Sequence, residues 1–285
     1  MPVFLLHLLI IIQLPAQSLL QQVEDSLPGR QKISGAFKST RVINAHSIEM
    51  LPKKNLDVRI MHRFGFLNSG IGQLYGLDNA SMRMGFDYGI TNNITIGFGR
   101  STFRKELDLF FKTRLLQQST GSGSLPFSIV VAAGYLVFTE EVFTLPKPGF
   151  NGRSSYYVQL LAGRKFSPAF SLQLSPMLVH SNEPVNAGDD HTIFALGGGA
   201  RLKVSKRVAL TLDYHYPVGN LHTSNTAPLS AGFDIETGGH VFQLQFSNAT
   251  GMNERSYLTQ TTGKFFKGDI RFGFNLSRIF ALGRH

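Results

Sequence analysis

Apolar and polar residues alternate with a period of two through most of this chain. From about Leu56 to the C-terminus, segments of roughly ten alternating residues are separated by turns, and no convincing amphipathic helix interrupts them. In a strand, this period sends successive side chains to opposite faces. Repeated segments of this kind are typical of a membrane-spanning β-barrel, in which one face meets lipid and the other lines a lumen.

The composition excludes a helical membrane protein. Charged residues make up 16% of the chain and the mean hydropathy is zero. After the N-terminus, no stretch approaches the roughly 20 apolar residues that a spanning helix needs. The 29 glycines, 24 phenylalanines and 8 tyrosines suit a barrel, although a soluble β-sandwich could share these totals.

The N-terminus carries an apolar run, Val3 to Leu14, which is too short to span a bilayer. It is followed by Pro15-Ala16-Gln17, which looks like a cleavage site, so residues 1–16 are predicted to be an export signal peptide. We then expect residues 17–55 to form a periplasmic or plug segment and residues 56–285 to form the barrel. The chain has no cysteine, which excludes disulfides and thiolate metal sites.

The alternating segments number about twelve, with ten or fourteen as alternatives. An even number returns both ends of the barrel to the periplasm, and the long loop 66–80 beside the short turn 91–93 predicts that the first strand runs outward. Pro176 lacks a ladder donor and is expected to interrupt its strand. The predicted strands are residues 56–65, 81–90, 94–103, 105–116, 127–138, 154–163, 170–180, 192–204, 208–216, 229–236, 241–247 and 268–280.

Three segments carry a family resemblance. They are TRVINAHSIEMLPKKNLDVRIMHRFG (residues 40–65), YGITNNITIGFGRS and GDIRFGFNLSRIF. Together they resemble an uncharacterised family of outer-membrane β-barrel proteins from bacteroidete bacteria. The resemblance implies an outer-membrane location in a Gram-negative cell, contact with outer-membrane lipid and lipopolysaccharide, and recognition of the C-terminal strand by the barrel-insertion machinery. It implies no agreed activity.

Strand parity predicts a charged lumen. A balanced set of charges indicates either a channel with transverse fields or a salt-bridged interior that holds a narrow barrel shut. We expect Arg41 to Met50 to lie inside or beneath the barrel. The predicted lumen-lining residues are Asp57, Arg59, Arg63, Arg83, Asp87, Glu106, Asp108, Lys112, Arg114, Arg201, Asp213, His215, Asp269 and Arg271.

Five apolar residues are also predicted to face inward, where they could line a path for a hydrophobic solute or pack against a plug. They are Phe110, Leu116, Val130, Leu136 and Phe138. The net charge of +10 comes from positive residues scattered over turns and ends, without a basic stripe interleaved with aromatics, so no nucleic-acid partner is expected.

Two clusters are candidates for hydrolysis: Asp213 with His215 on one strand, and Asp189-Asp190-His191 at the outer rim. Neither is accompanied by a G-x-S-x-G motif. A luminal ion pair explains the first cluster and a solvated loop explains the second without any catalytic role, and short charged clusters arise often in loops, so no catalytic residue, metal or cofactor is predicted. The leading hypothesis is a passive or gated conduit for small solutes. The alternative is a closed scaffold that binds a periplasmic or surface protein through its N-terminal segment or loops, and a hydrolase comes third.

Overall fold

The structure is a computed structural model that describes residues 29–141, 148–237 and 240–283. The expected export signal at residues 1–16 lies outside these residues, as do Gly238 and Gly239 between the predicted strands 229–236 and 241–247.

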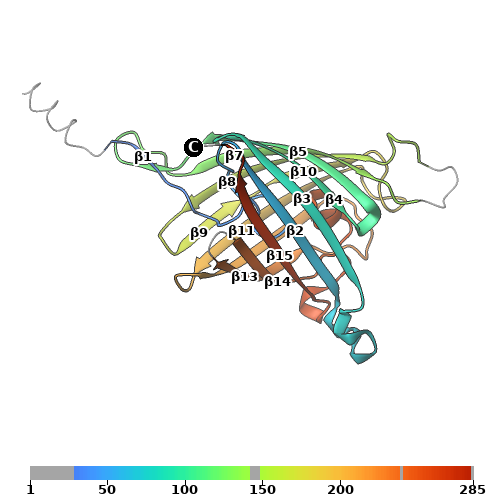
Figure 1. Ribbon diagram of the computed structural model, residues 1–285. Coiled ribbons are helices and arrows are strands. Elements are labelled where there is room, and N and C mark those ends of the chain that lie inside the picture. The colour runs from blue at the N-terminus through green and yellow to red at the C-terminus, as the bar shows by residue number, and fades with distance from the viewer. Residues whose placement is uncertain (1–28, 142–147, 238–239, 284–285) are drawn as a thin grey trace, which may run out of the picture.

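Twelve antiparallel strands form one closed barrel, as the sequence predicts (Figure 1). Each strand pairs with the next along the chain, and the last pairs with the first, with Phe280 opposite Leu56 and Phe274 opposite His62. The strands are β2 (Asn55–Phe66), β3 (Ala80–Thr91), β4 (Ile94–Ser101), β5 (Glu106–Leu116), β7 (Ser128–Phe138), β8 (Ser154–Lys165), β9 (Phe170–Leu174) continued by β10 (Met177–Ser181), β11 (Thr192–Lys203), β12 (Val208–Val218), β13 (Leu229–Thr237), β14 (His240–Ser247) and β15 (Arg271–Ala281).

The seventh strand is interrupted at Ser175 and Pro176, where the sequence predicts a break. Because proline has no N–H, the ladder cannot continue through it. The Ser175 N–H still donates to the Gly197 carbonyl at 2.8 Å, and the Pro176 carbonyl accepts from the Leu160 N–H at 3.0 Å. The chain therefore stays attached to both neighbouring strands across the break.

The two ends of the barrel differ. We call the end where β2 begins and β15 finishes the terminal end, and the opposite end the loop end. At the terminal end, the short strand β1 (Gln31–Lys32) pairs with β6 (Ser119–Thr120). The connection from β14 to β15 at the loop end contains α2 (Glu254–Thr259) and the short 3-10 turn η4 (Phe265–Lys267). No helix in the described ranges is long and apolar enough to cross a membrane.

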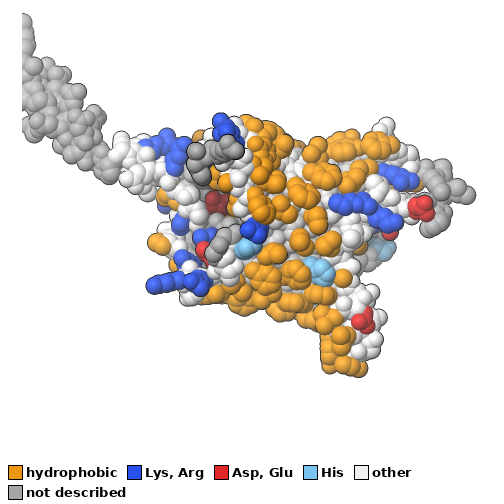
Figure 2. Space-filling model, in the orientation of Figure 1, with side chains coloured by type: hydrophobic (Ala, Val, Ile, Leu, Met, Phe, Trp, Pro, Cys, Tyr) orange, Lys and Arg blue, Asp and Glu red, His pale blue; other side chains and the backbone are white. Residues whose placement is uncertain are grey.

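The two faces of the wall have opposite chemistry. On β3, Arg83 and Asp87 point inward and are almost fully buried, whereas Phe86 between them points outward and is 39% exposed. Aromatic rings stack along the outer face, with His62 and Phe274 centroids 5.0 Å apart. Figure 2 shows apolar side chains over the wall and most Lys and Arg toward its ends. An apolar outer face around a polar interior is typical of a barrel wall that meets hydrocarbon.

A charge placed on the outer face should be costly in proportion to its depth. We expect Phe86→Arg, near the middle of β3, to lower the free energy of unfolding in lipid vesicles by about 2–4 kcal/mol. Ile90→Arg, on the same face near the strand end, should cost about 0–1 kcal/mol, because its guanidinium reaches the interface. Denaturant titration of both variants measures the difference. Equal losses, or no loss for Phe86→Arg, would contradict a lipid-facing wall.

Candidate functional site

The lumen is filled by a segment that precedes the first strand. Residues 36–51, which we call the plug, enter at the terminal end, turn back and leave at the same end to begin β2. The turn is closed by Val42 N–H to Ala45 carbonyl at 2.9 Å and Ser47 N–H to Thr40 carbonyl at 2.9 Å. From Val42 to Ile48 every plug residue is at least 97% buried. The plug is therefore a hairpin-like loop whose two ends lie on one side of the membrane.

Side chains of the wall hold the backbone of the plug. One carboxylate oxygen of Asp213 accepts from the Asn44 and Ala45 N–H groups at 2.8 and 3.0 Å. Amides from three further strands complete the set: Gln173 bonds the Ile48 N–H and the His46 carbonyl, Gln243 donates to the Val42 carbonyl, and Asn275 donates to the Ile43 carbonyl. Buried backbone groups need such partners, so the wall is matched to this segment.

Charged wall residues also contact the plug. The Lys112 ammonium donates to the carbonyls of Thr40 and Glu49 at 3.2 and 2.7 Å. The Thr40 hydroxyl accepts from Arg59 at 2.7 Å and donates to Asp87 at 3.2 Å, which joins a cation and a carboxylate of neighbouring strands through the plug. The lumen charges thus hold the plug as well as each other.

A second segment enters from the loop end. Residues 248–263, which we call the insert, include α2, whose six residues are all buried and which contacts β8, β10 and β12. The Asn253 side chain caps the helix by accepting the Ser256 N–H at 2.9 Å. Arg255 pairs with Glu106 of β5 at 2.6 Å. The insert therefore closes the lumen from the side opposite the plug.

The plug and the insert meet at one buried ion pair. Arg41 of the plug lies 2.7 Å from Glu254 of the insert, and each side chain is 1% exposed. His46 Nε2 lies 2.9 Å from the Tyr157 hydroxyl and 3.5 Å from Glu254. Arg41 is the one Lys or Arg side chain paired with Glu254 among the described residues.

The ion pair between Arg83 and Asp108 crosses an intervening strand. Arg83 on β3 bonds Asp108 on β5 through two contacts, at 2.9 and 2.5 Å, although β4 lies between them. A side chain at Gly99 of β4 would place its Cβ 2.2 Å from the Arg83 guanidinium, so only glycine leaves room for the pair. The glycine pattern of β4 is therefore part of the lumen network.

The structure places eleven of the fourteen predicted lumen residues inside the barrel, two at its mouths and one in a loop. The eleven from Asp57 to Lys112 and from Arg201 to His215 are buried in the lumen. Arg114 and Arg271 are half-buried at the terminal and loop mouths. The prediction for Asp269 was wrong: β15 begins at Arg271, and the Asp269 carboxylate lies in the preceding loop, where Asn68 and the Lys264 N–H bond it and lower its pKa.

The predicted inward apolar residues pack against the filling of the lumen. Phe110 and Leu136 belong to one apolar cluster with Ala45 of the plug and Tyr257 of the insert, and Val130 belongs to a second cluster with Phe37 and Ile48. Phe138 lies under Arg255. Leu116 was wrongly assigned to the lumen, because a register shift between Arg114 and Leu116 turns it outward, where it is 40% exposed. In this state these residues line no open path.

Several residues of the site have no counterpart in the sequence prediction. They are the inward amides Gln173, Gln243 and Asn275, and the insert residues Asn253, Glu254 and Arg255. Strand parity could have found the amides, since uncharged polar side chains at inward positions imply a polar partner. No hydrophobic period in the sequence predicts the insert, because its one helix is only six residues long.

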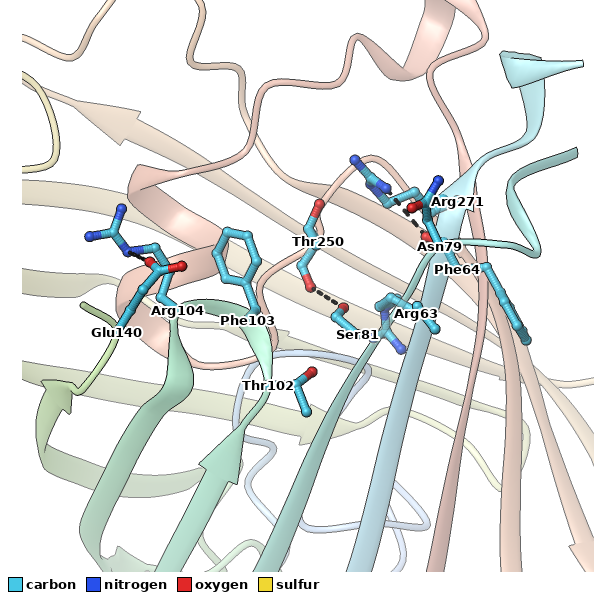
Figure 3. A pocket seen from close by; sticks show the side chains of 12 residues that line it. Arg63, Phe64, Asn79, Ser81, Thr102, Phe103, Arg104, Glu140, Thr250 and Arg271 are labelled. Atoms are coloured by element: carbon cyan, nitrogen blue, oxygen red, sulfur yellow. Dashed lines mark hydrogen bonds and ion pairs between the residues drawn. The ribbon is translucent and has the colours of Figure 1, made fainter. Parts of the chain in front are cut away.

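A pocket of about 370 Å³ opens at the loop mouth (Figure 3). It lies between the ends of β2 and β3 and the turn between β4 and β5, with Thr250 of the insert on one wall. Arg271 lies over the Phe66 ring at 3.6 Å, and Arg104 pairs with Glu140 at 3.3 Å across the mouth. Ser81 donates to the Thr250 carbonyl at 3.5 Å, which ties the insert to the wall.

The residues of the two candidate hydrolytic clusters form hydrogen bonds and ion pairs that stabilise the fold. His215 lies 3.2 Å from Asp213 and 3.2 Å from the Ser175 hydroxyl, an order of residues that resembles a catalytic triad. However, Ser175 has no exposed surface and the other Asp213 oxygen holds the plug. At the rim, Asp189 and Asp190 bind loop N–H groups of His222 and Asn220 instead of His191. No group of three possible metal ligands occurs in the described ranges.

The family of the chain follows from a match over almost the whole barrel. Residues 37–280, from the plug to the last strand, match the model of a family described as Membrane bound beta barrel domain (DUF5777). The chain belongs to this family. The description of this membrane-bound β-barrel names no substrate and no activity. No curated protein sequence matches the chain.

Solved structures with a similar architecture include porins and a channel. The NanC porin shares 6% identity (TM-score 0.48), with 79% of this chain and 98% of the porin covered. The KdgM porin shares 9% identity (TM-score 0.46; 81% and 99% covered). The COG4313 outer membrane channel from Pseudomonas putida F1 shares 11% (TM-score 0.44; 82% and 98%). Likenesses this distant carry no argument about what this membrane-bound β-barrel does.

Proposed function

We propose that this membrane β-barrel lies in an outer membrane and is a gated conduit for small solutes, which the plug holds shut. The observation that carries the proposal is the path of the plug. Both of its ends lie at the terminal end, so the whole loop can be withdrawn from the lumen without unthreading the chain or opening the wall. The wall holds the backbone of the plug through hydrogen bonds, which water can replace on withdrawal.

Withdrawal of the plug also loosens the insert. Glu254 would lose Arg41, its paired cation, and the apolar cluster would lose Ala45. A buried carboxylate without a partner is strongly disfavoured, so Glu254 would turn toward water in the emptied lumen. The polar wall left behind, with Arg59, Lys112 and Asp213, is the kind of surface that lines an aqueous pore.

Deletion of residues 17–50 tests the proposal. Recorded in planar bilayers, the full chain should be closed for most of the time and the deletion variant should conduct continuously, because the loop that fills the lumen is gone. The variant keeps Leu51 to Lys54, since the Lys54 N–H bonds the Gly89 carbonyl and anchors the start of the wall. Heat modifiability on gels serves as the control for a folded barrel.

A closed scaffold is the second candidate, and the apolar packing of the insert favours it. Met252, Tyr257 and Leu258 are fully buried, so the insert could remain in place after the plug has gone. A second variant, in which a short Gly-Ser linker also replaces residues 249–262, distinguishes the two. If both folded variants stay silent, the conduit proposal is wrong and the scaffold takes its place.

A further inference from the structure

The outer face of β12 and β13 carries a groove that runs toward the loop end. Its lower part is a hollow of about 330 Å³ above Ala231, which lies opposite Leu212 on β12 and Phe246 on β14. Its upper part is a hollow of about 320 Å³ beside Tyr214 and Leu229. Because Leu212 pairs with Ala231 and Tyr214 with Leu229, the two hollows lie in line along the same strand pair.

The groove is short enough to lie within one leaflet. From Leu210 in the lower hollow to Tyr214 in the upper one, the strand rises about 14 Å. Because barrel strands are tilted by about 35–45°, this stretch covers about 10–11 Å of depth, which fits within half of a hydrocarbon core of about 30 Å. The walls of the lower hollow are aliphatic and aromatic side chains, and small residues, among them Ala200 and Ala231, form its floor. An extended acyl chain fits such a surface.

Two lysines lie at the upper end of the groove. Lys264, just before the 3-10 turn η4, and Lys267, the last residue of that turn, line the upper hollow and are exposed. Neither forms an ion pair within the described ranges. The nearby Asp269 carboxylate is bonded to Asn68 and to the Lys264 backbone N–H, which leaves the ammonium groups unpaired. Phe266, 92% exposed between them, is an interfacial side chain in position and type.

We infer that this groove is a binding site for lipopolysaccharide, with an acyl chain of lipid A along β12 and β13 and a lipid A phosphate on Lys264 and Lys267. In the predicted orientation the loop end lies in the outward-facing leaflet, where this lipid resides. The combination of an apolar groove within one leaflet and a cation pair at headgroup height selects a phosphorylated lipid over a soluble anion, which would not need the groove. The inference is independent of whether the barrel conducts.

Native mass spectrometry of the full chain in mild detergent, titrated with purified lipid A or with phosphatidylglycerol, tests the inference. Lipid A should bind more tightly than phosphatidylglycerol. Lys264→Gln with Lys267→Gln should weaken lipid A binding roughly 30-fold, as expected for two lysines near an anionic headgroup. Ala231→Leu, which fills the groove and adds only apolar surface to a lipid-facing position, should also weaken it.

Matched controls separate this site from general attraction to lipid. Lys105→Gln removes an exposed lysine at the same end, on the turn between β4 and β5, and Ala133→Leu fills a different outward hollow, on β7. Both should leave binding unchanged. Equal or tighter binding of phosphatidylglycerol, unchanged binding in the groove variants, or equal losses in the controls would each overturn the inference.

Discussion

Replacement of Arg41 by methionine is expected to lower the free energy of unfolding by about 3–5 kcal/mol and to produce spontaneous channel openings. The change leaves the Glu254 carboxylate buried at 1% exposure without its cation. The penalty falls on the closed state, in which the plug and the insert touch. Denaturant titration measures the loss of stability, and planar-bilayer recording measures the openings.

The double variant Arg41→Met with Glu254→Met shows whether the effect belongs to the pair. With both charges removed, most of the stability should return, because no uncompensated charge remains in the lumen. Lys38→Gln is the matched control, since it breaks a plug-to-wall pair with Glu236 whose side chains are 35% and 28% exposed. Its cost should stay below about 1 kcal/mol. Equal losses for Arg41→Met and Lys38→Gln would contradict the assigned role of the buried pair.

The wall of the barrel was predictable because its signal is local. A period of two, read over one strand at a time, assigns Arg83 to the lumen and Phe86 to lipid without any knowledge of neighbours. The same rule fails where a strand starts late. Asp269 alternates correctly with Arg271 in sequence, but Asn68 and the Lys264 N–H hold it in a loop before β15 begins.

The partners of the lumen residues were not predictable in the same way. Arg83 reaches Asp108 over a strand whose glycines leave room, and Glu106 pairs with Arg255, which follows it by 149 residues. Parity gives the direction of a side chain but not what fills the space in front of it. The position of the plug could be predicted, because Arg41 to Met50 alternates like a strand but would make the strand count odd. The insert could not be predicted, because its sequence has no periodic pattern.

A disulfide between the plug and the wall should hold the proposed conduit closed. The chain has no cysteine, so an introduced pair has no competitor. A Cβ built on Gly199 of β11 lies 3.4 Å from the Val42 Cβ, close to the roughly 3.5–4.5 Å of disulfides, and Val42→Cys removes the methyl groups that would crowd it. The oxidised variant Val42→Cys with Gly199→Cys should therefore form without moving the backbone far.

The disulfide should have its largest effect on channel opening in a barrel whose plug is already weakened. In the Arg41→Met background, the oxidised form should be silent, because the plug is bonded to β11, and reduction should restore the openings of the parent. Each single cysteine variant in the same background is the control, and both should open whether or not reductant is present.

Recording one oxidised Arg41→Met, Val42→Cys, Gly199→Cys barrel in a planar bilayer, before and after addition of a thiol reductant, tests the gate most directly. We predict no current before the reductant and openings after it. The same current before and after, in a barrel shown to carry the disulfide, would contradict the claim that residues 36–51 close the lumen.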